Sequence, residues 1–119
     1  MKNILLFLVS AFLLSTASAQ LPDTDIFISE MRYENGIYSF TKPVNMTQRK
    51  GYDNQPSFSA DGSVFYFVSI NKDTTQSDIY QCDLKTKIIK SFTKTPTSEY
   101  SPKLTPNRKG LSVVRVDAD

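Results

Sequence analysis

The 119-residue sequence contains no histidine, no tryptophan, one cysteine and only four glycines. Without histidine the chain has neither a Ser–His–Asp triad nor a Cys–His pair, and it offers no imidazole to a metal ion. A single cysteine excludes an intrachain disulfide and a two-cysteine zinc site. The net charge of +2 provides no polycationic surface for nucleic acid. Composition therefore predicts no catalytic site within this chain, no cofactor, no bound metal and no nucleic-acid partner.

The first nineteen residues have the pattern of a secretory signal peptide. Lys2 is the only charge before Asp23, the stretch Ile4–Leu14 is almost wholly apolar, and small residues lead to an Ala-x-Ala site ending at Ala19. The apolar run is shorter than the about 20 residues that a transmembrane helix needs. We therefore expect residues 1–19 to be removed, with no membrane span left, and we expect a periplasmic or extracellular location in a bacterium.

A repeat with a period of 46 residues organises the rest of the chain. Residues of the same kind recur in one register, without a gap, over more than twenty positions. The shared pattern is an apolar residue with Thr, a polar loop, an acid, then Pro-x-apolar-[Ser/Thr]-x-[Asp/Asn] and an apolar strand. The matched pairs include Asp53 and Glu99, Pro56 and Pro102, Phe58 and Leu104, Ser59 and Thr105, and Asp61 and Asn107. Such an ordered set indicates that one structural unit is repeated.

Local patterns predict strands throughout the chain after residue 19, and no helix. The β-branched and aromatic run at 64–70 and its copy at 111–116 are typical of buried strands. Segment 78–84 alternates, and its Cys82 is expected to be a small buried hydrophobe. The predicted organisation is a strand pair at about 25–42, a full four-stranded unit at about 56–93 and a partial unit at about 102–117.

Segment 53–67 resembles the WD40-like propeller repeat of the TolB type, whose core motif is Pro-x-[Phe/Trp]-[Ser/Thr]-Pro-Asp-Gly followed by an apolar strand. The first copy has Ala60 where that family has Pro, and the second has Asn107 and Arg108 in place of Asp and Gly. The resemblance implies an all-β fold of β-propeller blades, each a four-stranded antiparallel sheet. The residues that match the repeat motif are Pro56, Phe58, Ser59, Asp61, Gly62, Pro102, Leu104 and Thr105.

The order of the predicted strands implies an incomplete propeller. Two strands, a full blade and two further strands make roughly two blades' worth, whereas the TolB-like family closes a ring of about six blades. Stacked repeats bury their faces only against neighbours, and roughly three or more are needed for stability. We therefore expect residues 20–119 to be the N-terminal part of a longer propeller, and to be marginally stable or aggregating when alone.

Other candidate chemistry in the sequence is sparse. Most carboxylates lie in turns or just before strands, where they hydrogen-bond local backbone, and no run is dense enough for a calcium loop. The serines have no histidine to activate them. Asp73-Thr74-Thr75 resembles the O-glycosylation site of some exported bacterial proteins, so added sugar at Thr74 is a hypothesis that intact-mass measurement tests.

Propeller geometry predicts that the loops at about 47–55, 71–77 and 94–101 share one face. Their mixture of aromatic and charged side chains suits a protein or peptide partner. The candidate partner-binding residues are Arg49, Tyr52, Asp53, Asn54, Glu99 and Tyr100. The alternative interpretation of the two acids is structural, because they recur in register and would orient the start of a strand in each repeat.

The resemblance and the missing catalytic residues favour a secreted, non-catalytic propeller that acts as a protein-interaction scaffold. The alternative is the propeller of a prolyl-oligopeptidase-type serine peptidase, whose catalytic domain would lie beyond residue 119. A downstream Gly-x-Ser-x-Gly motif followed by Asp and His would establish the peptidase, and an end after about six blades would establish the scaffold. A glycan-binding surface is a third hypothesis, since fold alone does not fix function. A glycan array on the full-length protein would test it.

Overall fold

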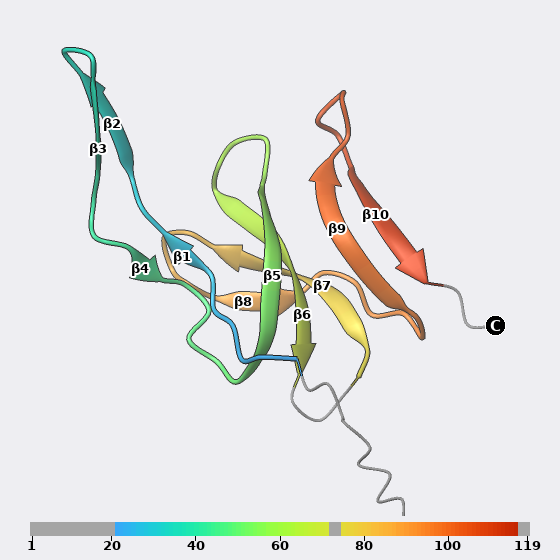
Figure 1. Ribbon diagram of the computed structural model, residues 1–119. Coiled ribbons are helices and arrows are strands. Elements are labelled where there is room, and N and C mark those ends of the chain that lie inside the picture. Colours follow the sequence, from blue (N-terminus) through green and yellow to red (C-terminus); the bar gives the residue numbers. More distant parts are fainter. Residues whose placement is uncertain (1–20, 72–74, 117–119) are drawn as a thin grey trace, which may run out of the picture.

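The computed structural model describes residues 21–71 and 75–116, and within them every regular element is a β-strand (Figure 1). The strands pair antiparallel in one sheet of four strands and three sheets of two strands. The predicted all-β class is confirmed for these residues. The predicted signal peptide at residues 1–19 and the glycosylation hypothesis at Thr74 lie outside them.

The largest sheet is a meander of four strands in chain order. Its central strand β6 buries Phe67 and Val68 completely, and because neighbouring residues point to opposite faces, both faces of the sheet are covered. The first strand begins well before the expected position 56, because the polar segment 51–54 pairs with the end of β6. The four strands are β5 (Gly51–Phe58), β6 (Val64–Asn71), β7 (Ser77–Asp83) and β8 (Ile89–Ser91).

A second sheet, formed by β9 (Ser98–Leu104) and β10 (Leu111–Val116), repeats β5 and β6 one period later. In both pairs the first strand carries a β-bulge, where the pairing register shifts. Each bulge contains a non-glycine residue with positive φ, Gln55 at 54° and Ser101 at 53°. These two residues are 46 apart, so the repeat is present in the backbone conformation as well as in the sequence.

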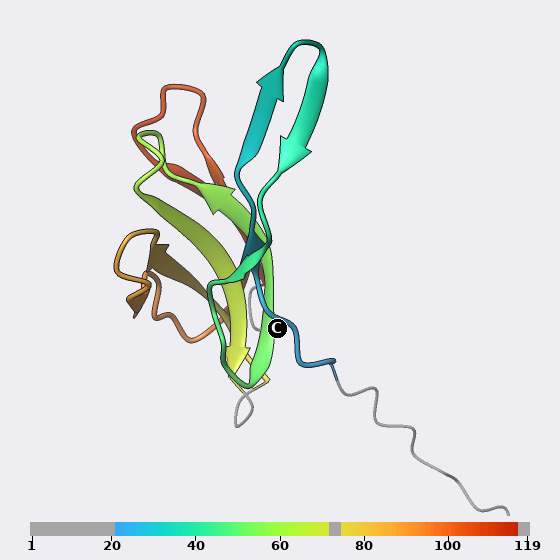
Figure 2. The same cartoon turned by 90° about the vertical axis from the view of Figure 1, so that its left-hand side faces the viewer.

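A long, interrupted hairpin precedes the four-stranded sheet, where the sequence predicts a strand pair at about 25–42. Asn35 and Gly36 have positive φ values of 51° and 82°, which suit the tight turn at its tip. The hairpin projects beyond the other sheets in both views (Figures 1 and 2). It consists of β1 (Phe27–Ile28) paired with β4 (Val44–Asn45), and β2 (Met31–Glu34) paired with β3 (Ile37–Phe40).

The base of this hairpin has the same hydrogen bonds as strands β7 and β8. The Ile26 amide donates to the hydroxyl of Thr47 at 3.0 Å, and the Ile79 amide donates to the hydroxyl of Thr93 at 2.9 Å. The carbonyl of each isoleucine also accepts a 2.8 Å bond from the residue before that threonine. β1 and β4 therefore match the third and fourth strands of the large sheet.

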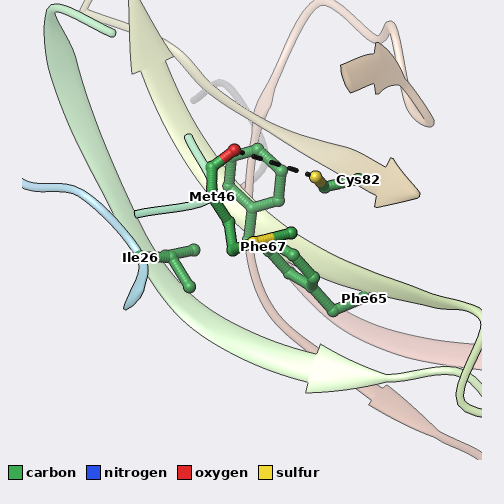
Figure 3. Close-up of a cluster of buried hydrophobic side chains, with 5 residues drawn as sticks. All are labelled: Ile26, Met46, Phe65, Phe67 and Cys82. Carbon is green, nitrogen blue, oxygen red and sulfur yellow. Dashed lines mark hydrogen bonds between the residues drawn. The ribbon is translucent and has the colours of Figure 1, made fainter. Parts of the chain in front are cut away.

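The apolar core lies between the base of the hairpin and one face of the four-stranded sheet. Ile26 and Met46 pack toward Phe65 and Phe67 of β6, with Cys82 of β7 beside them (Figure 3). The Cys82 thiol is fully buried, so the prediction of a small buried hydrophobe is confirmed, and burial raises its pKa.

The other side of the large sheet is covered by the second one. β9 packs against β5, β6 and β7, so the four-stranded sheet lies between the hairpin base and β9 (Figure 1). The described strands form open sheets rather than a closed ring.

Candidate functional site

Two buried carboxylates stand at equivalent places in β5 and β9. Asp53 is 2% exposed and Glu99 is 0% exposed. Burial of a charge is costly unless it is paired and hydrogen-bonded, so the partners of each acid decide what the site does.

Asp53 is held by one arginine and one hydroxyl. The Arg49 guanidinium donates in a bidentate arrangement, from Nε to Oδ2 at 2.9 Å and from Nη2 to Oδ1 at 2.9 Å. The Ser69 hydroxyl of β6 donates to Oδ1 at 2.7 Å. The guanidinium also lies 5.1 Å from the centre of the Tyr80 ring, within cation–π range. Asp53 therefore ties the β4–β5 loop to the middle of the large sheet.

Glu99 has the same two kinds of partner. The Thr95 hydroxyl donates to Oε1 at 2.9 Å, and Nη2 of Arg115 in β10 donates to the same oxygen at 2.8 Å. Burial raises the pKa of Glu99, but the hydrogen bonds from threonine hydroxyls and from Arg115 outweigh it, so the pKa lies below its ordinary value. Glu99 is therefore held as an anion, as its ion pair requires.

The two sites exchange the positions of their donors. The donor four residues before the acid is Arg49 in the first repeat and Thr95 in the second. The donor sixteen residues after it is Ser69 in the first and Arg115 in the second. Each acid thus keeps one arginine and at least one hydroxyl, although the residue types differ at both positions. This geometry favours the structural interpretation of Asp53 and Glu99, since each carboxylate is paired within the chain, although Oε2 of Glu99 is buried and has no hydrogen-bond partner among the described residues.

The remaining predicted partner-binding residues lie nearer the surface. Asn54 is exposed, whereas Tyr52 and Tyr100 are half-buried. The Asn54 side-chain amide donates to the Tyr52 hydroxyl, which fixes the two side chains against each other. Contact of these residues with a partner stays a prediction.

The repeat-motif acid forms a turn rather than a reactive site. The Asp61 carboxylate accepts bonds from the hydroxyl of Ser59 at 2.6 Å and from the amide of Ser63 at 3.1 Å. These hydrogen bonds lower the pKa of Asp61 to about 2, and the Ser59 hydroxyl contributes most. The second copy makes the same two bonds with Asn107 in place of the acid, from Thr105 at 2.6 Å and from Lys109 at 3.1 Å.

Alignment of the two repeats did not predict a contact that joins them. The Ser101 amide donates to Oε1 of Gln55 at 2.7 Å, so the bulge of one sheet is bonded to the equivalent bulge of the next. Both positions fall in the 46-residue register, but Gln and Ser share no side-chain type. Only the recurrence of a polar residue just before Pro56 and Pro102 could have drawn attention to them.

An apolar face on the projecting hairpin was also not foreseen. The register pairs Met31 with Phe40 and Tyr33 with Tyr38, so these four side chains share one face. All four are between 60% and 67% exposed. The two tyrosine rings lie 4.6 Å apart, centre to centre.

Metal and membrane sites were sought in the part of the chain that the structure describes. Within residues 21–71 and 75–116, no three Asp, Glu or Cys side chains come together as metal ligands. No helix that could cross a bilayer is formed by these residues.

Comparison of the chain with protein-family models, with curated proteins and with solved structures found no match. The likeness to TolB-type repeats therefore rests on the residues of this chain.

Proposed function

We propose that this chain supplies blades to an exported, TolB-like β-propeller that acts as a non-catalytic protein-interaction scaffold. Three features support the blade arrangement: the four-stranded antiparallel meander, the second sheet with the same bulge and turn, and the packing of one sheet on the next. The hairpin base, whose bonds match those of β7 and β8, is in this arrangement the outer half of a preceding blade.

The observation that carries the interaction role is the exposed face formed by Met31, Tyr33, Tyr38 and Phe40. Monomeric proteins rarely expose contiguous large apolar side chains, and aromatic residues and Met are enriched at protein interfaces. The face lies on the projecting part of the hairpin, which the matching pair β7–β8 lacks (Figure 2). Because blade packing does not use this extension, its apolar side chains are available to a partner protein or peptide.

Site-specific photo-cross-linking tests this function. A photoreactive phenylalanine analogue replaces Tyr38 in one variant and Ser39, on the opposite face of the same strand, in the matched control. The full sequence is expressed in an exporting bacterial host and irradiated in intact cells. We expect a discrete adduct with one other protein from position 38 and none from position 39. Equal adducts from both positions, or an adduct only with a second copy of the chain, would contradict the scaffold proposal.

A further inference from the structure

Basic residues are concentrated in one exposed segment, although the chain as a whole is nearly neutral. Residues 84–98 contain four lysines and no acidic residue, whereas the full sequence has 14 basic and 12 acidic residues. All four lysines are exposed, and none forms an ion pair within the described part of the chain. They are Lys85, Lys87, Lys90 and Lys94. The positive charge of this segment is therefore not balanced within it.

The fold puts these lysines at an outer edge of the four-stranded sheet. Lys90 lies in β8, which pairs with β7 alone among the described strands, and Lys85 and Lys87 lie in the turn between those two strands. The acid closest to them in the sequence is Asp83, whose carboxylate accepts bonds from the amides of Lys85 and Thr86. Asp83 therefore stabilises the turn, and the outer edge of the sheet carries an excess of positive charge.

Two large apolar side chains are exposed among the lysines. Ile88 is 54% exposed and Phe92 is 48% exposed. Lysines on an edge strand discourage pairing with another sheet, but that role needs no exposed apolar side chains. An anionic membrane surface accepts both kinds of residue, because its phosphates attract lysines and the boundary of its acyl chains takes up apolar side chains. The mixture therefore favours a membrane surface over a purely polar polyanion.

An open cleft beside this segment adds two further cations. It has a volume of about 450 Å³ and lies between the β5–β6 turn and the β9–β10 turn. Its wall includes the rings of Tyr66 and Phe92, 4.9 Å apart, and its lining includes Arg108 and Lys109. Asp61 also lines the cleft, but hydroxyl groups of its own turn already donate to its carboxylate. The cleft thus combines an aromatic wall with a positive rim, which suits a phosphate-bearing headgroup.

We propose that residues 85–94 and the β9–β10 turn form a basic surface that docks the protein on anionic phospholipid membranes. The lysines and the two turn cations contact headgroup phosphates, and Ile88 enters the boundary between headgroups and acyl chains. Lysine suits a fluid array of headgroups, because its ammonium group is a point charge that needs no fixed bidentate partner. This basic surface does not include the apolar face of the projecting hairpin.

Vesicle co-sedimentation of the full sequence, expressed in an exporting host and purified, tests the inference. Vesicles of phosphatidylcholine alone are compared with vesicles that contain about 30% phosphatidylglycerol, a headgroup with a net negative charge. We expect at least about tenfold stronger binding to the anionic vesicles, and loss of that preference when NaCl is raised from about 0.05 M to about 0.5 M. Equal binding to both kinds of vesicle, or binding that salt does not weaken, would overturn the inference.

A matched pair of variants tests whether the basic surface is responsible. Lys87→Gln with Lys90→Gln removes two of its charges, and Lys42→Gln with Lys50→Gln removes two exposed charges elsewhere. Since each lysine near an anionic membrane contributes about fivefold to affinity, the first variant should bind about 25-fold more weakly. The control should lose less than about threefold, because its charges lie outside the contact. Equal losses would mean that only net charge matters, and would overturn the assignment to this surface.

A third variant separates a membrane from a soluble polyanion. Ile88→Ser keeps every charge and changes an exposed turn residue, but it removes the side chain expected at the acyl boundary. Binding to anionic vesicles should weaken by at least about threefold. An unchanged affinity would overturn the membrane proposal, since a polyanion would then account for the lysines. None of these results affects the photo-cross-link at Tyr38, so the two proposals fail separately.

Discussion

At the scale of single residues, the two buried acids bind the same kinds of donor, but the arginine and the hydroxyl residue exchange positions in the sequence. Each acid pairs with one arginine and with at least one hydroxyl, and the two donors lie on either side of the acid in the sequence. We expect Arg49→Thr to lower the free energy of unfolding by about 3 kcal/mol, because it leaves Asp53 buried without its cation. Adding Ser69→Arg, which imports the second repeat's arrangement, should restore at least half of that loss.

Tyrosine fluorescence during urea unfolding measures both effects, since the chain has six tyrosines and no tryptophan. Lys50→Thr, beside Arg49 on the exposed side of the loop, is the control and should change stability by less than about 0.5 kcal/mol. A double variant that is less stable than Arg49→Thr alone would show that the two positions are not interchangeable.

The turn acid makes stability depend on pH in a defined window. Hydrogen bonds lower the pKa of Asp61 to about 2 from an ordinary 3.8, so its contribution is complete above pH 3.8 and is lost as pH falls toward 2. Asp61→Asn cannot titrate, yet Asn107 shows that an asparagine makes the same turn bonds. We therefore expect the stability difference between parent and Asp61→Asn to narrow as pH falls from 4 to 2. Urea midpoints measured from pH 4 to pH 2 check this expectation. A constant difference between the parent and Asp61→Asn would contradict the lowered pKa of Asp61.

At the scale of the strand, the repeated bulge places a residue with positive φ in the middle of β5 and of β9. Ser101→Val should lower the free energy of unfolding by about 1–2 kcal/mol, because a β-branched residue resists the left-handed conformation. Ser101→Gly keeps the amide that donates to Gln55 and relieves the strain, so it should stay within about 1 kcal/mol of the parent. Urea unfolding compares the two variants, and equal losses would show that the side chain, not the backbone, is responsible.

The strands themselves were largely predictable, because their apolar patterns are local. The run 64–70 and its copy 111–116 correspond closely to β6 and β10. The start of β5 was not predictable from local pattern, since the polar segment 51–54 is a strand only because β6 offers it a partner. Likewise, alignment of the two repeats matched Asp53 with Glu99 but could not identify their hydrogen-bond donors, because Arg and a hydroxyl residue exchange places between the repeats.

At the scale of the whole molecule, exposed apolar side chains lie on the projecting hairpin and on strand β10. Val114 and Val116 of β10 are 57% and 54% exposed, although their counterparts in β6, Val68 and Ile70, are buried and half-buried. A chain that exposes its strand edges and apolar residues in this way is prone to associate. We therefore expect the isolated chain to associate through this exposed face of β10.

A charge placed on β10 distinguishes association through this strand from non-specific association through exposed apolar residues. Val114→Arg puts a cation on the exposed apolar face of β10, whereas Ile88→Arg puts one at a site of similar exposure, 54%, in the turn between β7 and β8. Burying an unpaired charge at an interface costs several kcal/mol, so Val114→Arg should weaken association through this face of β10 by at least tenfold in dissociation constant. Ile88→Arg should leave the stoichiometry unchanged. Light scattering over a dilution series measures both, and equal sensitivity of the two variants would mean that association does not use the edge of β10.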